Sequence, residues 1–330
     1  MKKQFLLSVF ASITFAGVSY AQFNTSDING YIGGFYIGDQ ALNQATAFTQ
    51  SQIRTGSGVS AEVAYSDYEA SEDEGRRFKG DVTTGSGSIG YVHDFDFLSV
   101  GIGLSGTSGE LDAEGTDINP NVTLESEADG WLITLGAGKT WEKFSLVLTG
   151  TAGELSADTD REAVVGAATK TADYDLSLFQ VEFSALYELI TNETFSLSAL
   201  AKLGYTSLEA DGFTESAAID AVEIDDFEDD RTYGVIGLEG ALLSLGSFIP
   251  YASVSVWQDF GDDEVELSGF DPASNEFSTE IPDAVETAIL GKVGFDYEIG
   301  EDWLVGASVG FFSGDDVDGF DASLGATFRF

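Results

Sequence analysis

Apolar and polar residues alternate one by one along most of the chain. Between residues 195 and 206 every odd position is apolar, from Phe195 to Tyr205, whereas the even positions include Ser196, Lys202 and Thr206. Successive side chains of a β-strand point to opposite faces of the sheet. The pattern therefore predicts a strand with one apolar and one polar face, and it recurs at 174–188 and 302–312.

The same alternation predicts about twelve strands, most of them long enough to cross a bilayer at a tilt. Their ranges are 58–70, 82–94, 97–109, 129–141, 143–155, 174–188, 195–208, 232–244, 248–259, 285–298, 302–312 and 319–330. The connections alternate between two kinds. Short ones lie at 93–97, 141–144, 189–194, 243–248 and 298–303, and long acidic ones at 71–81, 110–127, 158–173, 209–231 and 259–283.

Sorted connections are typical of transmembrane β-barrels, which have short periplasmic turns and longer extracellular loops. A soluble β-sandwich is the alternative, but it has no reason to sort its loops by length. We therefore predict an all-β fold over residues 55–330. It is an antiparallel up-and-down barrel of about twelve strands, located in the cell outer membrane.

In such a barrel the apolar face of each strand contacts lipid and the polar face lines the lumen. The charged residues on lumen-facing positions are Glu62, Glu182, Lys202, Glu239, Lys292 and Arg329. Charged groups are costly in a dry core but tolerated in a polar lumen. Aromatic residues next to the short turns fit a girdle at the headgroup level, namely Trp141, Tyr187, Phe195, Tyr297 and Trp303.

The first residues predict export. A basic start, a short apolar run and small residues before Gln22 form a secretory signal peptide over residues 1–21. Residues 22–54 form a separate N-terminal segment, in which 39–54 has helical spacing of Leu42, Ala45 and Phe48. This helix is expected to plug the lumen, with a mobile periplasmic tail as the alternative. Residues 30–38 could instead form a further strand and push the count toward fourteen.

The amino-acid composition excludes several classes of function. The net charge is −43, and it becomes −45 when Lys2 and Lys3 leave with the signal peptide. This charge argues against nucleic-acid binding, which requires a basic surface. Cysteine is absent, which excludes disulfides and thiolate chemistry. The single histidine, His93, lies next to a short turn, and no GxSxG or HExxH motif is present. We predict a protein that is not an enzyme and uses no cofactor.

The acidic loops concentrate the hard oxygen ligands that Ca²⁺ and Mg²⁺ prefer. The candidate ligands are Asp225, Asp226, Asp229, Asp230, Asp262, Asp263, Asp315, Asp316 and Asp318. Their spacing does not match a dedicated calcium loop. We expect weak divalent binding that bridges to lipopolysaccharide, or else simple hydration of the loops.

The final strand alternates to the last residue, with Phe320, Leu324, Phe328 and Phe330 on one face. It resembles the signal that Gram-negative outer-membrane barrels present to their assembly machinery. The closing stretch from Trp303 to Phe330 is similar to the last strands of autotransporter β-domains. The resemblance covers approximately residues 55–330 and implies a lumen helix and a partner in the barrel assembly machinery.

Three functions follow from the sequence. The first is an autotransporter-like translocator domain with little or no passenger, since only residues 22–54 precede the first strand. The second is a small porin or solute channel that is biased toward cations by Glu62, Glu182 and Glu239. The third is a structural or adhesive surface barrel that acts through its acidic loops.

Overall fold

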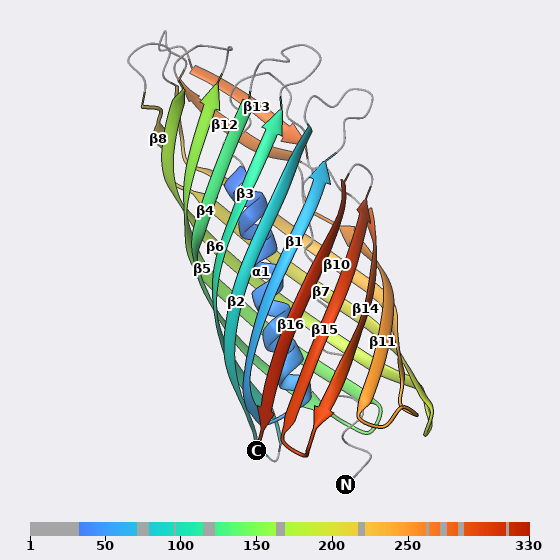
Figure 1. Cartoon of the computed structure of the whole chain (residues 1–330). Helices are drawn as coiled ribbons and strands as arrows, with labels where there is room; N and C mark the ends of the chain where they lie inside the picture. The colour runs from blue at the N-terminus through green and yellow to red at the C-terminus, as the bar shows by residue number, and fades with distance from the viewer. Residues whose placement is uncertain are drawn as a thin grey trace.

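A computed structural model of the chain describes residues 33–70, 79–95, 97–114, 123–162, 169–216, 222–261, 264–270, 276–282, 287–314 and 317–330. In these residues twelve antiparallel strands close into one barrel around a single helix (Figure 1). The predicted fold class and the strand number of twelve are confirmed. The predicted signal peptide and residues 22–32 lie outside the described residues.

The barrel strands follow the chain up and down, each paired with its neighbours in sequence order. They are β1 (Gly58–Ala70), β2 (Lys79–Asp94), β3 (Ser99–Glu114), β4 (Thr123–Thr140), β5 (Phe144–Glu162), β6 (Lys170–Thr191), β7 (Phe195–Ala210), β10 (Phe227–Leu242), β11 (Phe248–Asp259), β14 (Thr287–Ile299), β15 (Trp303–Gly314) and β16 (Val317–Arg329). The barrel closes where β1 pairs with β16, from Gly58 opposite Arg329 to Ala70 opposite Val317. Closure leaves the barrel without an open edge.

The outward face of β4 changes from apolar to acidic along the strand. In β4 the outward side chains near the turn end are Trp131, Ile133 and Leu135, whereas Glu125, Glu127 and Asp129 point outward nearer the other end. An apolar band of this kind faces hydrocarbon, and the acidic part lies beyond it in water or headgroups. The short turns therefore mark the periplasmic end, and the long connections mark the outer end.

A second, four-stranded sheet lies across the outer end of the barrel (Figure 1). It consists of β8 (Phe213–Thr214), β9 (Glu223–Ile224), β12 (Glu264–Phe270) and β13 (Glu276–Pro282). We call it the cap sheet. It corrects the prediction that 209–231 and 259–283 are plain loops. The predicted loops 110–127 and 158–173 were also too long, because β3 to β6 continue into them.

The helix α1 (Gly33–Thr55) runs along the lumen, and its side chains are almost entirely buried (Figure 1). Among the described residues, no helix is long and apolar enough to cross a membrane. The helix starts six residues before the predicted start at Asp39. Hence residues 33–38 are helical and the fourteen-strand alternative is wrong. Phe35, Tyr36 and Ile37 are all buried, which a helix apolar on every side achieves and a one-sided strand does not.

Packing overrides the glycines at the start of α1. A Cβ at Gly34 would lie 2.6 Å from Leu176 Cδ1, and one at Gly38 would lie 2.8 Å from Leu178 Cδ2. Glycine disfavours a helix by about 1 kcal/mol relative to alanine, but only glycine lets the helix approach β6 this closely. Sequence propensity therefore placed the helix start too late.

Candidate functional site

The helix lies closer to one side of the barrel wall than to the other. It packs mainly against β2 to β6, with smaller contacts to β1 and β7, and it leaves β11 and β14 to β16 largely uncovered. Its first turn lies at the outer end, where Phe35 packs on Phe227 with ring centroids 4.9 Å apart. Its last residue, Thr55, lies at the turn end beside the start of β1. The chain thus passes through the lumen from the outer end to the periplasmic end before the barrel begins.

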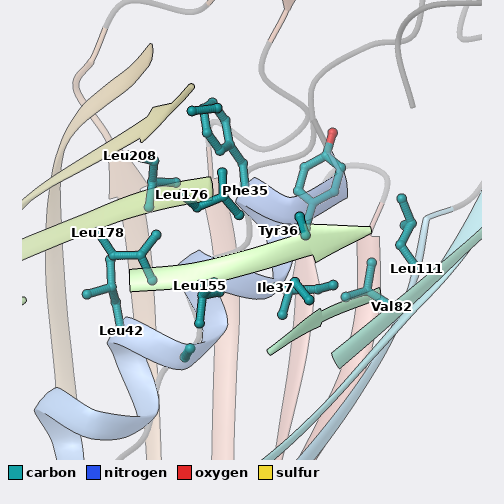
Figure 2. Close-up of a cluster of buried hydrophobic side chains, with 14 of the residues drawn as sticks. Phe35, Tyr36, Ile37, Leu42, Val82, Leu111, Leu155, Leu176, Leu178 and Leu208 are labelled. Atoms are coloured by element: carbon teal, nitrogen blue, oxygen red, sulfur yellow. The ribbon is translucent and has the colours of Figure 1, made fainter. Parts of the chain in front are cut away.

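A large cluster of apolar side chains lies in the outer half of the lumen. Phe35, Tyr36, Ile37 and Leu42 of α1 pack into a cluster that draws residues from every barrel strand (Figure 2). We call its wall residues the apolar layer, and each is at most 4% exposed: Tyr68, Val82, Leu111, Leu132, Leu155, Leu176, Leu208, Val235, Trp257, Leu290, Phe312 and Val317. The cap sheet adds Val265 and Leu267 from above.

Below the apolar layer, α1 is held by hydrogen bonds to polar wall residues. Thr46 Oγ1 donates to Gln180 Oε1 at 2.5 Å, and Gln180 Nε2 donates to Asn43 Oδ1 at 2.9 Å. One turn further along, Gln50 Nε2 donates to Glu182 Oε1 at 2.7 Å. The buried polar side chains of α1 and β6 thus find their hydrogen-bond partners in each other.

Glu182 is the centre of the buried network. Besides Gln50, its carboxylate accepts from Lys202 Nζ at 2.8 Å and from the Tyr233 hydroxyl at 2.8 Å. Arg54 donates to Ser184 in the next lumen-facing position of the same strand. The wall of β6 therefore presents one polar residue to each successive turn of α1.

A buried ion triad joins the helix to β10. Arg231 Nη2 lies 3.1 Å from Asp39 Oδ1, and Arg231 Nε lies 3.1 Å from Asp229 Oδ2. All three residues are buried, with Asp39 and Arg231 each 3% exposed and Asp229 7% exposed. Inside a protein such charges are tolerated only when paired. The triad therefore fixes the position of α1 relative to the far wall.

The end of α1 is built to turn sharply into the first strand. Gly56 has φ +98°, a conformation that favours glycine, and its N–H donates to Gln52 O at 3.1 Å. Asp94 Oδ2 then accepts from the Ser57 N–H at 3.0 Å, and Ser57 Oγ accepts from the Asp94 N–H at 2.8 Å. The helix and the barrel wall are thus joined without a flexible linker.

The predicted lumen charges lie inside the barrel on the described strands. Glu182 and Lys202 form one pair, Lys292 Nζ lies 3.7 Å from Asp321 Oδ1, and Arg329 Nη2 lies 3.7 Å from Glu298 Oε1. Glu239 is 1% exposed, and neither carboxylate oxygen has a hydrogen-bond partner among the described residues. Glu239 interacts electrostatically with Lys202 and Lys292, and Lys292 interacts with Glu62, so these charges form a connected group across the lumen, whereas Arg329 pairs with Glu298.

A cavity lies between the last turns of α1 and the uncovered wall. It is lined by Ser51, Gln52 and Thr55 of the helix and by Glu62, Asp296 and Thr327 of the wall. We call it the vestibule. Its lining is mixed, since Phe48, Tyr251 and Leu304 lie beside these polar groups, and it lies near the short turns, at the opposite end of the lumen from the apolar layer.

The predicted girdle residues lie on the outer surface near the short turns. Trp141, Tyr187, Tyr297 and Trp303 are 45–50% exposed, and Phe195 is half-buried. His93 also points outward, with its ring centroid 4.6 Å from that of Phe95. The single histidine is therefore part of an aromatic surface and not of the lumen.

The terminal strand β16 closes the barrel with its apolar side chains outward. Phe320, Leu324, Phe328 and Phe330 are 37–65% exposed, and the Phe330 ring stacks near Tyr91 with centroids 6.1 Å apart. On the same outer surface, the Phe320 ring lies near Tyr65 and the Phe328 ring lies near Trp303.

We expect deletion of Phe330 to impair insertion while the few barrels that form keep native stability. The reason is that Phe330 is 65% exposed, so the folded barrel loses little buried surface. Heat-dependent mobility on gels measures the folded fraction in outer membranes. Phe97→Ala, at a comparably exposed turn residue of 72% exposure, is the control. Equal folded fractions for both variants would contradict an assembly role.

The five predicted metal ligands that the structure describes are not gathered into one site. Asp229 is buried in the ion triad, whereas Asp225, Asp226, Asp230 and Asp318 are exposed. Asp226 Oδ1 accepts from the Gly212 N–H at 2.6 Å, and Asp225 Oδ2 accepts from Ser268 Oγ at 3.0 Å. Asp262, Asp263, Asp315 and Asp316 lie outside the described residues. Among the described residues, Glu110, Asp112 and Glu125 are the carboxylates close enough to share an ion, on the outer wall of β3 and β4.

Sequence reasoning missed the residues that hold the helix. Gln40, Asn43, Thr46, Gln50 and Arg54 recur at spacings of three or four residues. This polar stripe was a visible signal that the helix binds a polar wall as well as an apolar one. The wall partner Gln180 and the triad residue Arg231 carried no such signal, because strand alternation alone does not reveal which side chains meet.

Comparison with known proteins identifies the family. The family model described as "Autotransporter beta-domain" matches residues 59–310. A search of curated proteins gave no match. The match covers most of the chain and the outer-membrane location follows from it.

Solved structures share the fold at low sequence identity. The translocator domain of the autotransporter NalP from Neisseria meningitidis has a TM-score of 0.68 at 14% identity, covering 88% of this chain and 93% of that chain. The transport unit of the autotransporter AIDA-I from Escherichia coli gives 0.61 at 12%, covering 83% and 90%. The toluene transporter TodX from Pseudomonas putida gives 0.52 at 12%, covering 96% and 100%. With a family model that matches residues 59–310, this chain belongs to the autotransporter β-domain family.

Proposed function

We propose that the protein is a non-enzymatic autotransporter-type translocator that delivers the residues N-terminal to Gly33 to the cell surface. One observation carries this proposal. The helix α1 enters the lumen at the outer end, at Phe35, and leaves it at the periplasmic end, at Thr55. Because Gly33 lies at the outer end, any residues attached ahead of it start outside the apolar band.

The hydrogen bonds between α1 and the polar wall residues of β6 support the same function. Gln180, Glu182 and Ser184 point into the lumen from successive inward positions of β6, and each binds one turn of the helix. A hydrogen bond between neutral groups contributes about 0.5–1.5 kcal/mol, and one to a charged group such as Glu182 or Arg54 contributes about 1.5–3 kcal/mol. A lumen of this kind lets a polar segment pass and then holds it at rest.

The test is the surface exposure of an epitope tag. A tag inserted directly before Gly33 is expected to be accessible to antibody and protease on intact cells. The same tag in the turn between β10 and β11, at residues 243–247, is the control and is expected to be accessible only after the outer membrane is permeabilised. A tag before Gly33 that is hidden on intact, correctly assembled barrels would contradict the translocator function.

The same proposal includes two partners of the barrel. The barrel assembly machinery is the expected partner of β16, and lipopolysaccharide is the expected neighbour of the acidic outer wall. The cation-biased channel and the adhesive surface barrel remain alternatives that depend on the lumen and on the cap sheet. A tag hidden on intact cells together with steady cation conductance would favour the channel.

A further inference from the structure

One row of paired residues crosses the vestibule wall from β1 to β14. Glu62 of β1 lies opposite Gly325 of β16, which in turn lies opposite Gly306 of β15. Gly306 lies opposite Asp296 of β14, and all four residues line the vestibule. The row therefore has a carboxylate at each end and two residues without side chains between them.

The two carboxylates lie over the two glycines. A Cβ at Gly306 would clash with Asp296 Oδ1, and one at Gly325 would lie 3.4 Å from Glu62 Oε2. Neither glycine has a positive φ, so the backbone conformation does not require glycine there. Glycine inside a strand often marks a place where a ligand comes close to the backbone. The two glycines keep the space between the carboxylates open.

Glu62 has no counter-charge of its own among the described residues. The cation that interacts with it is Lys292, but Lys292 Nζ lies 3.7 Å from Asp321 Oδ1. Lys292 also interacts electrostatically with Glu239. One ammonium group is thus shared by three carboxylates.

Asp296 is buried without a hydrogen bond. It is 6% exposed, and its carboxylate accepts no hydrogen bond from the residues that the structure describes. The cation that interacts with it, Arg329, has its Nη2 3.7 Å from Glu298 Oε1, and Glu298 repels Asp296. A buried carboxylate is costly unless it is paired. A bound cation would supply the partner that Asp296 lacks.

The helix contributes an unsatisfied amide to the same cavity. Gln52 is 4% exposed, and neither Nε2 nor Oε1 has a hydrogen-bond partner in the described part of the chain. Its amide lies over Gly90 of β2, which pairs with Ser60 of β1, so it lies toward the Glu62 end of the row. Buried amide groups are rarely left without a partner.

The dimensions and lining favour an organic cation over a metal ion. Glu62 and Asp296 are three strand spacings apart, which is about 14 Å between their Cα atoms. A metal ion needs its oxygen ligands within about 2.0–2.6 Å. Phe48 and Tyr251 add aromatic rings to the lining, and such rings attract organic cations. The cavity encloses about 500 Å³ of space, part of it open to solvent, which is enough for a small molecule.

We propose that the vestibule binds a short aliphatic diamine. One ammonium group pairs with Glu62 and the other with Asp296, and the hydrocarbon chain lies across Gly325 and Gly306. The amide oxygen of Gln52 accepts a further N–H at the Glu62 end. This inference goes beyond the proposed export function and does not depend on it.

Isothermal titration calorimetry on the full-length barrel in detergent micelles tests this site. The probe is 1,4-diaminobutane, and 1-butylamine is the matched ligand with a single charge. We expect the diamine to bind about tenfold more tightly, because a second charged group gains a hydrogen-bonded partner. Equal affinity for the two amines, or tighter binding of Mg²⁺ in competition with the diamine, would overturn the proposal.

Three variants locate the binding in the vestibule. Glu62→Gln and Asp296→Asn are each expected to weaken diamine binding about tenfold, to the level of 1-butylamine. Gly306→Ala places a methyl group against Asp296 and is expected to weaken it as well. Glu301→Gln, at an exposed short turn outside the cavity, is the control and is expected to bind like the unmodified chain.

Heat-dependent gel mobility verifies that each variant is folded. If Gly306→Ala does not fold, the nearly isosteric Glu62→Gln still decides the outcome. Unchanged affinity in folded Glu62→Gln and Asp296→Asn would show that the diamine binds elsewhere and would contradict the site. The tag experiment on export is unaffected by either result, so the two proposals fail separately.

Discussion

A barrel that begins at Thr55, and so lacks α1, is expected to conduct in planar bilayers at a level roughly an order of magnitude above that of the complete mature chain. Barrels of eight strands are filled by their own side chains, whereas wider barrels leave space that something else must fill. Here α1 fills it, since Phe35, Ile37 and Leu42 occupy the centre of the apolar layer and are at most 3% exposed.

The control for this experiment is a chain that begins at Gly33. It lacks the same upstream residues but retains the helix, so it is expected to remain closed. The folded state of both chains is verified by heat-dependent gel mobility before conductance is recorded. If the chain from Thr55 is folded and silent, then wall side chains and the cap sheet close the lumen, and α1 is not required.

Arg231→Ala is expected to lower the free energy of unfolding by about 3–5 kcal/mol, because it leaves two buried carboxylates without a counter-charge. Asp39 and Asp229 each have a carboxylate oxygen 3.1 Å from the guanidinium, and both are buried. Since Asp39 belongs to α1 and Asp229 to β10, the loss is expected to loosen the helix as well. Unfolding in denaturant, followed by tryptophan fluorescence in detergent micelles, measures the change.

Two controls separate the triad from a general loss of positive charge. Lys143→Ala, at an exposed turn residue, is expected to change stability by less than about 0.5 kcal/mol. The triple variant Asp39→Asn, Arg231→Met, Asp229→Asn removes all three charges and is expected to recover most of the stability, because neutral replacement of a buried ion pair is often tolerated. A triple variant as unstable as Arg231→Ala would indicate that packing rather than charge balance is the cause.

The barrel was predictable from sequence because the alternation of apolar and polar residues can be recognised within each strand separately. The alternation in 195–206 places Lys202 and Phe195 on opposite faces whatever the neighbouring strands are, and the short turns fix the order of pairing. The predicted loops were too long because the outward residues beyond the apolar band are acidic. In β4, Glu125 and Glu127 look like loop residues in sequence, yet backbone pairing with β3 and β5 continues through them.

The interior was less predictable because it depends on contacts between residues far apart in the chain. The helix start at Gly33 is determined by Leu176 and Leu178, which belong to β6 and are separated from α1 in sequence by five barrel strands. The cap sheet forms because β9, in one connection, pairs with β12 in another. Neither connection has enough apolar surface to predict a sheet by itself.

The sequence alone determined the class of this protein, since a twelve-strand alternation, sorted turns and an apolar terminal strand are local patterns that require no knowledge of the partner strands. Only the tertiary structure decided that α1 occupies the lumen. Ile37 is 0% exposed because it belongs to a cluster that includes residues from all twelve barrel strands. That cluster is set by strand pairing and closure, which position side chains across the lumen independently of their neighbours in sequence.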